Sequence, residues 1–317
     1  MELKKQHDRH IAADIPDEWF VPKKSNQAEA EAVVRPSLSY WKDAWRRLLK
    51  NKLAMAGLTF LIFLAFMAIF GPIISPHDVT EQKLMNQNLP PSSKHWFGTD
   101  ELGRDVFSRT WYGARISLFV GIVAALIDFA IGVVYGGIAG YKGGKTDNVM
   151  MRIVEILYGL PYLLIVILIS VVMGPGLFTI IFALTVTGWI GMARIVRGQV
   201  LQIKNYEFVL ASKTFGTKTS RIIKKNLLPN TMGPIIVQMT LTVPSAIFAE
   251  AFLSFLGLGI QPPFASWGSM ASDGLSTILS GHWWRLFFPA FFISLTMFSF
   301  NVLGDGLQDA LDPKLRR

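Results

Sequence analysis

Long apolar segments constrain this chain more than any other feature of its sequence. Leu53–Ile74 contains 22 residues and no charged side chain. At about 1.5 Å per residue, a helix of that length crosses a hydrocarbon core of roughly 30 Å. Further apolar segments, each bounded by charge, Gly or Pro, are Ile116–Tyr141, Ile153–Met173, Leu177–Ala193, Met232–Gly257 and Leu286–Gly304. The pattern predicts an all-α, polytopic membrane protein with six transmembrane helices and lipid as its solvent.

The composition agrees with a membrane protein. Hydrophobic residues make up 51% of the 317 residues and charged residues only 17%, with a mean hydropathy of +0.38. A net charge of +9 would suggest nucleic acid as the partner of a soluble chain. Here the same charge has another use, because basic residues in short loops set the orientation of membrane helices. We therefore expect no nucleic-acid partner.

The distribution of basic residues predicts which side each loop occupies. With six spans, the termini, the loop between spans two and three and the loop between spans four and five share one side. That side carries 25 Lys and Arg residues against 6 on the other. Cytoplasmic loops are enriched in Lys and Arg, so both termini and the central loop are predicted to be cytoplasmic.

Two segments are expected along the chain. Residues 1–52 form a cytoplasmic N-terminal tail, mobile over residues 1–35, and an interfacial helix in which aromatic and basic residues alternate from Tyr40 to Lys52. Such a helix suits an anionic lipid surface, with a solvated charged helix as the alternative. Residues 53–317 form the transmembrane domain, including a cytoplasmic loop at 199–231.

That central loop is the one long basic interruption of the apolar second half. Between Arg194 and Asn230 there are eight Lys or Arg residues and a single acid, Glu207. Glu207–Phe215 lacks Gly and Pro, Gly216 interrupts the helical pattern, and Lys218–Leu228 resumes it until Pro229 stops it. The loop is therefore predicted to be a helix, a turn and a second helix. A Gly between two helical stretches commonly adopts φ > 0, and we expect this of Gly216.

The spacing of Ala211, Gly216 and Leu228-Pro229 resembles the cytoplasmic "EAA" loop of permease subunits in binding-protein-dependent ABC importers. The family pattern has Glu-Ala-Ala where this chain has Leu210-Ala211-Ser212, and Ile where this chain has Asn226. Glu207 is a candidate replacement for the missing acid, one turn earlier. The resemblance implies contact with the ATPase subunits through Glu207, Leu210, Ala211, Ser212, Lys213, Gly216, Leu228 and Pro229.

Three further stretches resemble the oligopeptide and dipeptide permease subfamily: GTDELGRDVFSR followed by YGARISL, SFLGLGIQPPFASWGSMASDG, and GDGLQDALDPKL. The resemblance covers about Leu38–Arg317. It implies one of two permease subunits of an ATP-driven peptide importer in the bacterial cytoplasmic membrane, without cofactor or enzymatic activity of its own. The implied partners are a second permease, two cytoplasmic ATPases and an extracellular peptide-binding lipoprotein or periplasmic binding protein.

Ionisable residues within apolar segments are candidates for function, because a charge in hydrocarbon is costly. The segments contain three such acids, Asp128, Glu155 and Glu250. For Asp128 we expect a structural hydrogen bond across a helix interface rather than a proton relay, and for Glu155 a position facing loop charges such as Arg152. Proline can kink a transmembrane helix, and the spans contain Pro161, Pro244 and Pro289.

Two apparent motifs are set aside. AGYKGGKT (139–146) fits a relaxed phosphate-loop pattern, but it follows a membrane span instead of a strand, so Gly143, Gly144 and Lys145 are interpreted as a tight turn. The charges from His95 to Arg109 match no metal-site spacing, so we expect an ordered, self-paired external loop. Open alternatives for the whole chain are an importer permease for nickel or another small solute, a proton-coupled carrier using Asp128, Glu155 and Glu250, and a scaffold.

Overall fold

The computed structural model describes residues 40–312. Residues 1–39, including the expected tail, and 313–317 lie outside the described residues. The described part is helical, and within it the sole β-type pairing is an isolated bridge between Thr99 and Asp105. In chain order, the helical elements are α3 (Tyr40–Lys50), α4 (Lys52–Ile74), η2 (Leu84–Asn86), α5 (Val106–Lys142), α6 (Gly144–Gly159), α7 (Tyr162–Met173), α8 (Leu177–Ile203), α9 (Glu207–Thr214), α10 (Thr219–Ile222), η3 (Ile223–Leu227), α11 (Leu228–Phe255), α12 (Trp267–Leu275) and α13 (Trp284–Leu311).

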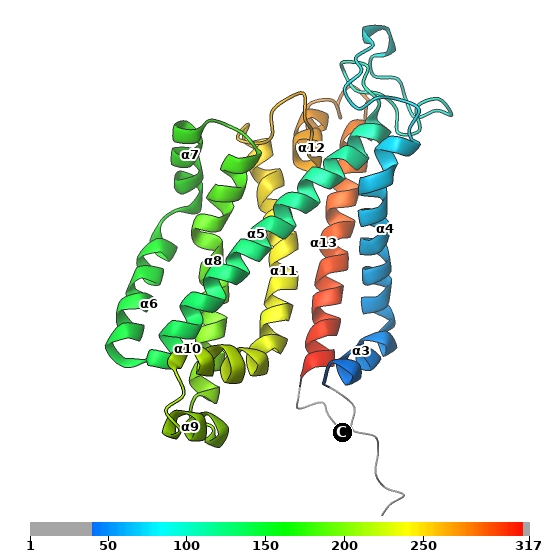
Figure 1. The fold of residues 1–317 in the computed structure, drawn as a ribbon. Coiled ribbons are helices and arrows are strands. Elements are labelled where there is room, and N and C mark those ends of the chain that lie inside the picture. Colours follow the sequence, from blue (N-terminus) through cyan, green and yellow to red (C-terminus); the bar gives the residue numbers. More distant parts are fainter. Residues whose placement is uncertain (1–39, 313–317) are drawn as a thin grey trace, which may run out of the picture. The chain divides into compact units, whose positions relative to one another are not determined.

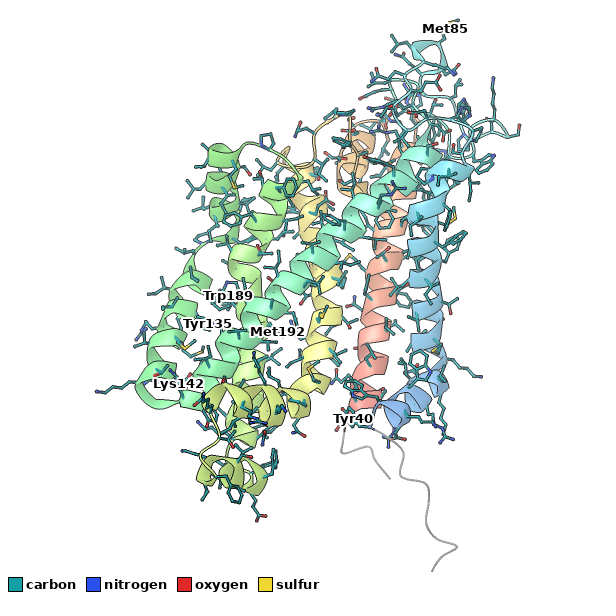
Figure 2. The ribbon with its side chains drawn as sticks, in the orientation of Figure 1. Tyr40, Met85, Tyr135, Lys142, Trp189 and Met192 are labelled. Carbon is teal, nitrogen blue, oxygen red and sulfur yellow. The ribbon has the colours of Figure 1, made fainter. Side chains whose placement is uncertain are left out.

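Five segments are long and apolar enough to cross a membrane, and α6 with α7 makes a sixth if the bent pair counts as one span. The six-helix prediction is confirmed in this form. The turn between α5 and α6 lies at the same end of the helices as α9 and α10, whereas α12 and the loop after α4 lie at the opposite end (Figure 1). Met85 marks the tip of that loop and Lys142 the other end (Figure 2).

Helix α5 is the longest element and the centre of the packing. Its 37 residues would extend about 55 Å at 1.5 Å per residue, well beyond a hydrocarbon core of about 30 Å. The helix accordingly begins ten residues before the apolar segment predicted for it and runs obliquely past α8, α11 and α13 (Figure 1). Its buried side chains contribute to the core with α11, α12 and α13.

Glycines allow α5 and α8 to approach closely. Gly132, Gly136 and Gly140 recur every four residues and so lie on one face of α5. A Cβ atom at Gly140 would lie 2.9 Å from the carbonyl oxygen of Arg197, and one at Gly136 would overlap the backbone of Ala193. Small residues at such spacing let membrane helices pack backbone to backbone. Tyr135 and Trp189 then fill the adjoining space beside α6 (Figure 2).

The third predicted span is not one kinked helix, which corrects the expectation for Pro161. Helix α6 ends at Gly159, Pro161 caps the start of α7, and the two helix axes differ by 81°. A residue before proline is disfavoured in the α conformation, and Leu160 accordingly has an extended ψ of 132°. By contrast, Pro244 and Pro289 lie inside the continuous helices α11 and α13, as predicted.

Candidate functional site

The 199–231 loop contains α9 and α10, which share a small core. Val209 of α9 is 1% exposed and packs in one buried cluster with Ile222 and Leu227. The same cluster includes Val196 and Val200 of α8, so the loop is joined to the end of a membrane helix by apolar packing. The predicted helix-turn-helix is confirmed.

Gly216 ends α9 with a left-handed residue, as the sequence predicted. Its φ is +70°. The N–H of Gly216 donates to Lys213 O at 3.0 Å and the N–H of Thr217 to Ser212 O at 3.2 Å, which together make a Schellman cap. A Cβ atom at Gly216 would meet nothing within 4 Å, so the requirement for glycine comes from the backbone conformation and not from crowding.

The outer face of α9 is apolar and exposed. Aromatic residues gather at its two ends: Tyr206 and Phe208 are 56% and 42% exposed, and Phe215 is 87% exposed. Leu210 is 47% exposed between them. Glu207 and Lys213 are also exposed, in the first and last turns, where their charges complement the helix dipole. Apolar side chains in this number on a short, well-anchored helix are typical of a surface that another protein covers.

The prediction that Pro229 stops the second helix of the loop is wrong. Pro229 lies in the first turn of α11, and helical backbone continues from Thr219 to Phe255. The five residues before Leu228 form a π-helical turn, Ile223–Leu227. Pro229 has no N–H to donate to the preceding turn, and the widened π-helical turn Ile223–Leu227 accommodates it without interrupting the helix. Leu228 and Pro229 therefore join the loop rigidly to α11.

The hydrogen bond expected for Asp128 is not formed. Its side chain is 4% exposed, and Oδ1 is buried without a hydrogen-bond partner among the described residues. The carboxylate lies against Gly188 of α8, where a Cβ atom would come within 2.8 Å of Oδ1. Asp128 lines a groove of about 410 Å³ between α5, α7, α8 and α11. A buried carboxylate facing a groove without a partner is a candidate binding group.

Glu250, in contrast, is fully satisfied inside the protein. It is 0% exposed, and its carboxylate accepts from Ser266 Oγ at 2.6 Å, Ser254 Oγ at 2.8 Å and Ser117 Oγ at 3.3 Å. Ser117 belongs to α5 and Ser266 caps α12. Glu250 thus joins three elements, which supports the helix-packing interpretation of this residue over a position on the pathway.

The remaining candidates, Glu155 and the turn at Gly143, Gly144 and Lys145, lie on or beside α6. Glu155 is exposed and pairs with Arg152 at 3.0 Å, as predicted. Gly143 and Gly144, with φ of +66° and +54°, form the tight turn between α5 and α6, and Lys145 follows in the first turn of α6. Nothing here resembles a strand followed by a phosphate-binding loop.

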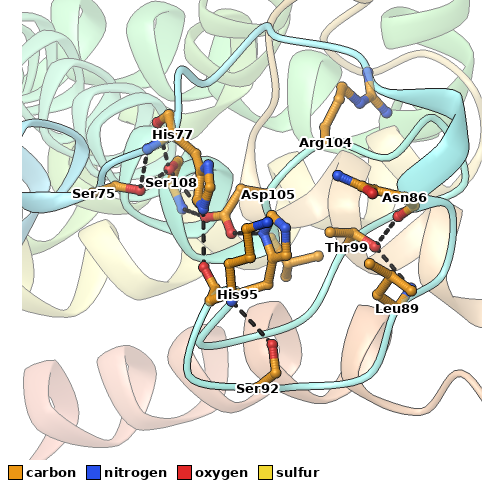
Figure 3. Close-up of polar contacts among 12 residues, drawn as sticks. Ser75, His77, Asn86, Leu89, Ser92, His95, Thr99, Arg104, Asp105 and Ser108 are labelled. Atoms are coloured by element: carbon orange, nitrogen blue, oxygen red, sulfur yellow. Dashed lines mark hydrogen bonds and ion pairs between the residues drawn. The ribbon is translucent and has the colours of Figure 1, made fainter.

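The loop after α4 is self-paired, as predicted. Asp100 contacts Arg104 Nε at 2.6 Å and Arg109 Nε at 3.6 Å, while Glu101 pairs outside the loop with Arg285 of α13 at 3.2 Å. Asp105 caps α5 by accepting from the N–H of Ser108 at 2.9 Å (Figure 3).

Figure 3 also shows His77, which the sequence analysis overlooked, beside His95 and Asp105. Ligand atoms of these three residues lie within 4.8 Å of one another, a donor set suited to zinc or nickel. However, the two rings stack 4.4 Å apart, His95 Nδ1 pairs with Asp105 at 3.0 Å and His77 Nε2 with Lys94 O at 2.9 Å. Hydrogen bonds and stacking account for this cluster.

Other residues missed by sequence reasoning are Tyr162, Ser117, Ser266 and Phe215. The hydroxyl of Tyr162 is buried without a partner among residues 40–312 and borders the same groove as Asp128. Serines carry no distinctive sequence signal, because their role depends on Glu250 from another helix. The aromatic residues at the ends of α9 were visible in the sequence, and their placement outside an apolar span was the available signal.

Comparisons with known proteins agree on one family. Residues 132–317 match the family described as "Binding-protein-dependent transport system inner membrane component", and residues 39–91 match the N-terminal transmembrane domain of oligopeptide transport permease C. The dipeptide transport system permease protein of Bacillus subtilis is 79% identical over 96% of this chain and 95% of its own. The oligopeptide transport system permease protein of the same organism is 60% identical over 96% and 99%.

Among solved structures, a chain of the MetNI methionine ABC transporter in inward-facing conformations has a TM-score of 0.52 at 20% identity. The match covers 63% of this chain and 94% of that one, and it supports the fold alone. The family match spans more than half of the sequence, and the relatives align over nearly all of it. The chain is therefore a multi-pass membrane protein that belongs to the family of inner-membrane components of binding-protein-dependent transport systems.

Proposed function

We propose that this chain is a permease subunit of an ATP-driven ABC importer and forms part of the pathway that carries peptides across the cytoplasmic membrane. Support comes from the names of its relatives, which are dipeptide and oligopeptide permeases at 79% and 60% identity. The nickel alternative finds no support in those names. The groove beside Asp128 also lacks histidine among its lining residues, whereas imidazole is a common nickel ligand.

ATP hydrolysis belongs to separate subunits in this proposal. The chain pairs with a second permease, two cytoplasmic ATPases and an external peptide-binding protein, and the family description, binding-protein-dependent transport, supports the binding-protein partner. The termini and the 199–231 loop face the cytoplasm, since that side carries the excess of Lys and Arg.

The single observation that carries the mechanism is the surface of α9. A helix that transmits force must be fixed to its own subunit by its inner face and must bind the partner protein with its outer face. Val209 fixes the inner face through the core shared with α8, and the exposed aromatic residues Phe208 and Phe215 provide the outer contact surface. Because helix runs without interruption from Thr219 to Phe255, movement of the loop is passed directly into the membrane helix that lines the groove.

Helix movements of this kind switch membrane proteins between two packed states. When the ATPases close, α9 moves as a rigid body, and α11 exchanges inward-facing for outward-facing packing. The break between α6 and α7 at Leu160 and Pro161 lets the halves of the third span move separately.

The proposal is tested by reconstituting the four-component transporter with its binding protein in liposomes. We expect uptake of a labelled dipeptide that requires internal ATP and stops when this chain is omitted. Uptake driven by a proton gradient without the ATPases would instead support a carrier, and ATP-driven uptake of nickel in place of peptide would support the other substrate class.

A further inference from the structure

The groove between α5, α7, α8 and α11 contains one charged side chain. Asp128 lies in its wall at 4% exposure. Within residues 40–312 no Lys, Arg or His lies within ion-pair distance of this carboxylate, and Oδ1 has no hydrogen-bond donor. A buried, unpaired carboxylate is costly for the folded protein. A ligand that supplies the missing donors would relieve this cost.

The carboxylate lies against a glycine of the neighbouring helix α8. Asp128 projects from α5 onto Gly188 of α8, and only the absence of a side chain at Gly188 leaves room for it. Tyr162 of α7 borders the same groove, and its hydroxyl is also buried with no partner in the described part of the chain. Two unpartnered polar groups from different helices therefore border one groove.

The hydroxyl groups across the groove, on α11, provide acceptors. Thr242 Oγ1 donates to Gln238 O at 2.9 Å, and Ser245 Oγ donates to Leu241 O at 3.0 Å. Each hydroxyl has one proton, and both protons are used within the helix. Towards the groove, Thr242 and Ser245 can therefore only accept. Together with Asp128, they give this part of the groove, which Gln238 and Tyr162 also line, a negative and acceptor character that fits a cation with several N–H donors.

Among cations, an ammonium group fits this surface better than a bare metal ion. An ammonium group has three donors and no acceptor, so one carboxylate and nearby hydroxyl oxygens can satisfy it. Calcium requires six to eight oxygen ligands, and nickel is served by imidazole, yet the lining contains a single carboxylate and no histidine. The volume of about 410 Å³ also lies in the range of small-molecule sites.

We propose that Asp128 binds the α-ammonium group of the transported peptide while the peptide lies in this groove, with Tyr162, Thr242 and Ser245 as neutral polar neighbours. This inference rests on the proposed function as a peptide permease and assigns the chemistry of one point on the pathway. A single charge contact of this kind orients the peptide by its amino end. It is also independent of the peptide's side chains, because every peptide with an unmodified amino terminus carries this ammonium group.

Direct photolabelling tests the assignment without relying on the selectivity of the binding protein. The probe is a dipeptide with a diazirine side chain and an unmodified amino terminus, added to the assembled transporter in nanodiscs with the binding protein left out. We expect labelling of α5 or α11 in this chain. The unlabelled dipeptide should compete at least about tenfold better than its Nα-acetylated form, since acetylation removes a charge-assisted hydrogen bond.

Variants then place the effect on Asp128. Asp128→Asn should lower the labelling and abolish the difference between the two competitors, whereas Asp128→Glu should retain it. Asp305→Asn is the matched control: it makes the same chemical change on α13 at an exposed position outside the groove, and it should leave labelling unchanged. If Asp128→Asn does not assemble, the assignment is still tested by whether the wild-type protein and the Asp128→Glu variant prefer the competitor with an unmodified amino terminus.

Several results would overturn the assignment. Equal competition by the acetylated and unmodified peptides is one, and an unchanged preference in Asp128→Asn is another. Competition by an Nα-acetylated lysine peptide as strong as that of the unmodified dipeptide would show that any ammonium group suffices. Failure of the proposed function looks different, because then even the wild-type transporter would show no ATP-dependent dipeptide uptake.

Discussion

The side-chain amide of Asn226 donates a 2.7 Å hydrogen bond to Ser212 Oγ, which in turn donates to the carbonyl oxygen of Phe208 at 2.9 Å. Ser212 lies on α9 and Asn226 lies in the π-helical turn η3. These two residues occupy positions where the family pattern discussed above has Ala and Ile. The two departures compensate each other, because a polar contact replaces an apolar one and still fixes α9 against the base of α11.

A double-mutant cycle should reveal this compensation. Ser212→Ala removes the acceptor of the Asn226 amide and Asn226→Ile removes the donor, so each change alone should destabilise the loop by about 1 kcal/mol. The double variant restores the family pattern and should cost less than the sum of the two. Thermal unfolding of the purified permease pair and retention of the ATPases should follow the same order. Additive losses would indicate that the two residues act independently.

Substitutions at Gly216 should act through backbone conformation. At φ of +70° a side chain with Cβ costs about 1 kcal/mol or more, and Asn suffers least among non-glycine residues. We expect Gly216→Leu to leave membrane insertion and pairing with the sister permease intact but to lower ATPase copurification and uptake together, and Gly216→Asn to lower them less. ATPase copurification at the wild-type ratio with Gly216→Leu would contradict a docking role for the loop.

Phe215 offers a complementary test, because its side chain is 87% exposed and contributes little to the fold. Phe215→Ser should leave the melting temperature of the isolated permease within experimental error, as most exposed substitutions do. Loss of a buried aromatic anchor at an interface typically costs about 2 kcal/mol or more, so ATPase binding should weaken by roughly 30-fold. Met85→Ser, at 99% exposure on the opposite end, serves as the control that changes neither property.

Replacing Glu250 should lower stability rather than alter peptide selectivity. Glu250→Leu leaves the hydroxyls of Ser117, Ser254 and Ser266 buried without their acceptor, at about 1–3 kcal/mol each. The detergent-solubilised protein should therefore melt several degrees lower, and Glu250→Gln should recover part of the loss. Glu155→Leu, which removes an exposed carboxylate on α6, should change the melting temperature little. Equal effects of the two leucine variants would argue against the three-serine contact.

The orientation is accessible because the chain contains no cysteine, so single cysteines can be introduced without background. Met85→Cys and Leu279→Cys, both almost fully exposed at one end, should react with an impermeant thiol reagent added outside intact cells. Lys145→Cys, exposed at the other end of the helices, should react only after the membrane is opened. The reverse pattern would falsify the proposed orientation.

Local sequence features were enough to predict the six apolar segments, the helix-turn-helix between them and the left-handed conformation of Gly216. These features depend on local chemistry: transfer of apolar side chains out of water selects the spans, and the intrinsic freedom of glycine selects the cap. The same local rules failed at Pro229, because a proline that ends a helix and one that a π-helical turn accommodates within a helix look alike in sequence.

Side-chain partners, in contrast, depend on the packing of segments that are distant in the sequence. Glu250 and Ser117 are separated by 133 residues, and Asn226 contacts Ser212 across a turn. Asp128 resembles Glu250 in the sequence, since both are single acids in apolar segments, yet one faces a groove and the other is surrounded by hydroxyls. The physical reason is that hydrophobicity specifies that a helix is buried in the membrane, whereas the rotation and neighbours of each helix, set by close packing such as that of Gly136 and Gly188, decide what each polar group meets.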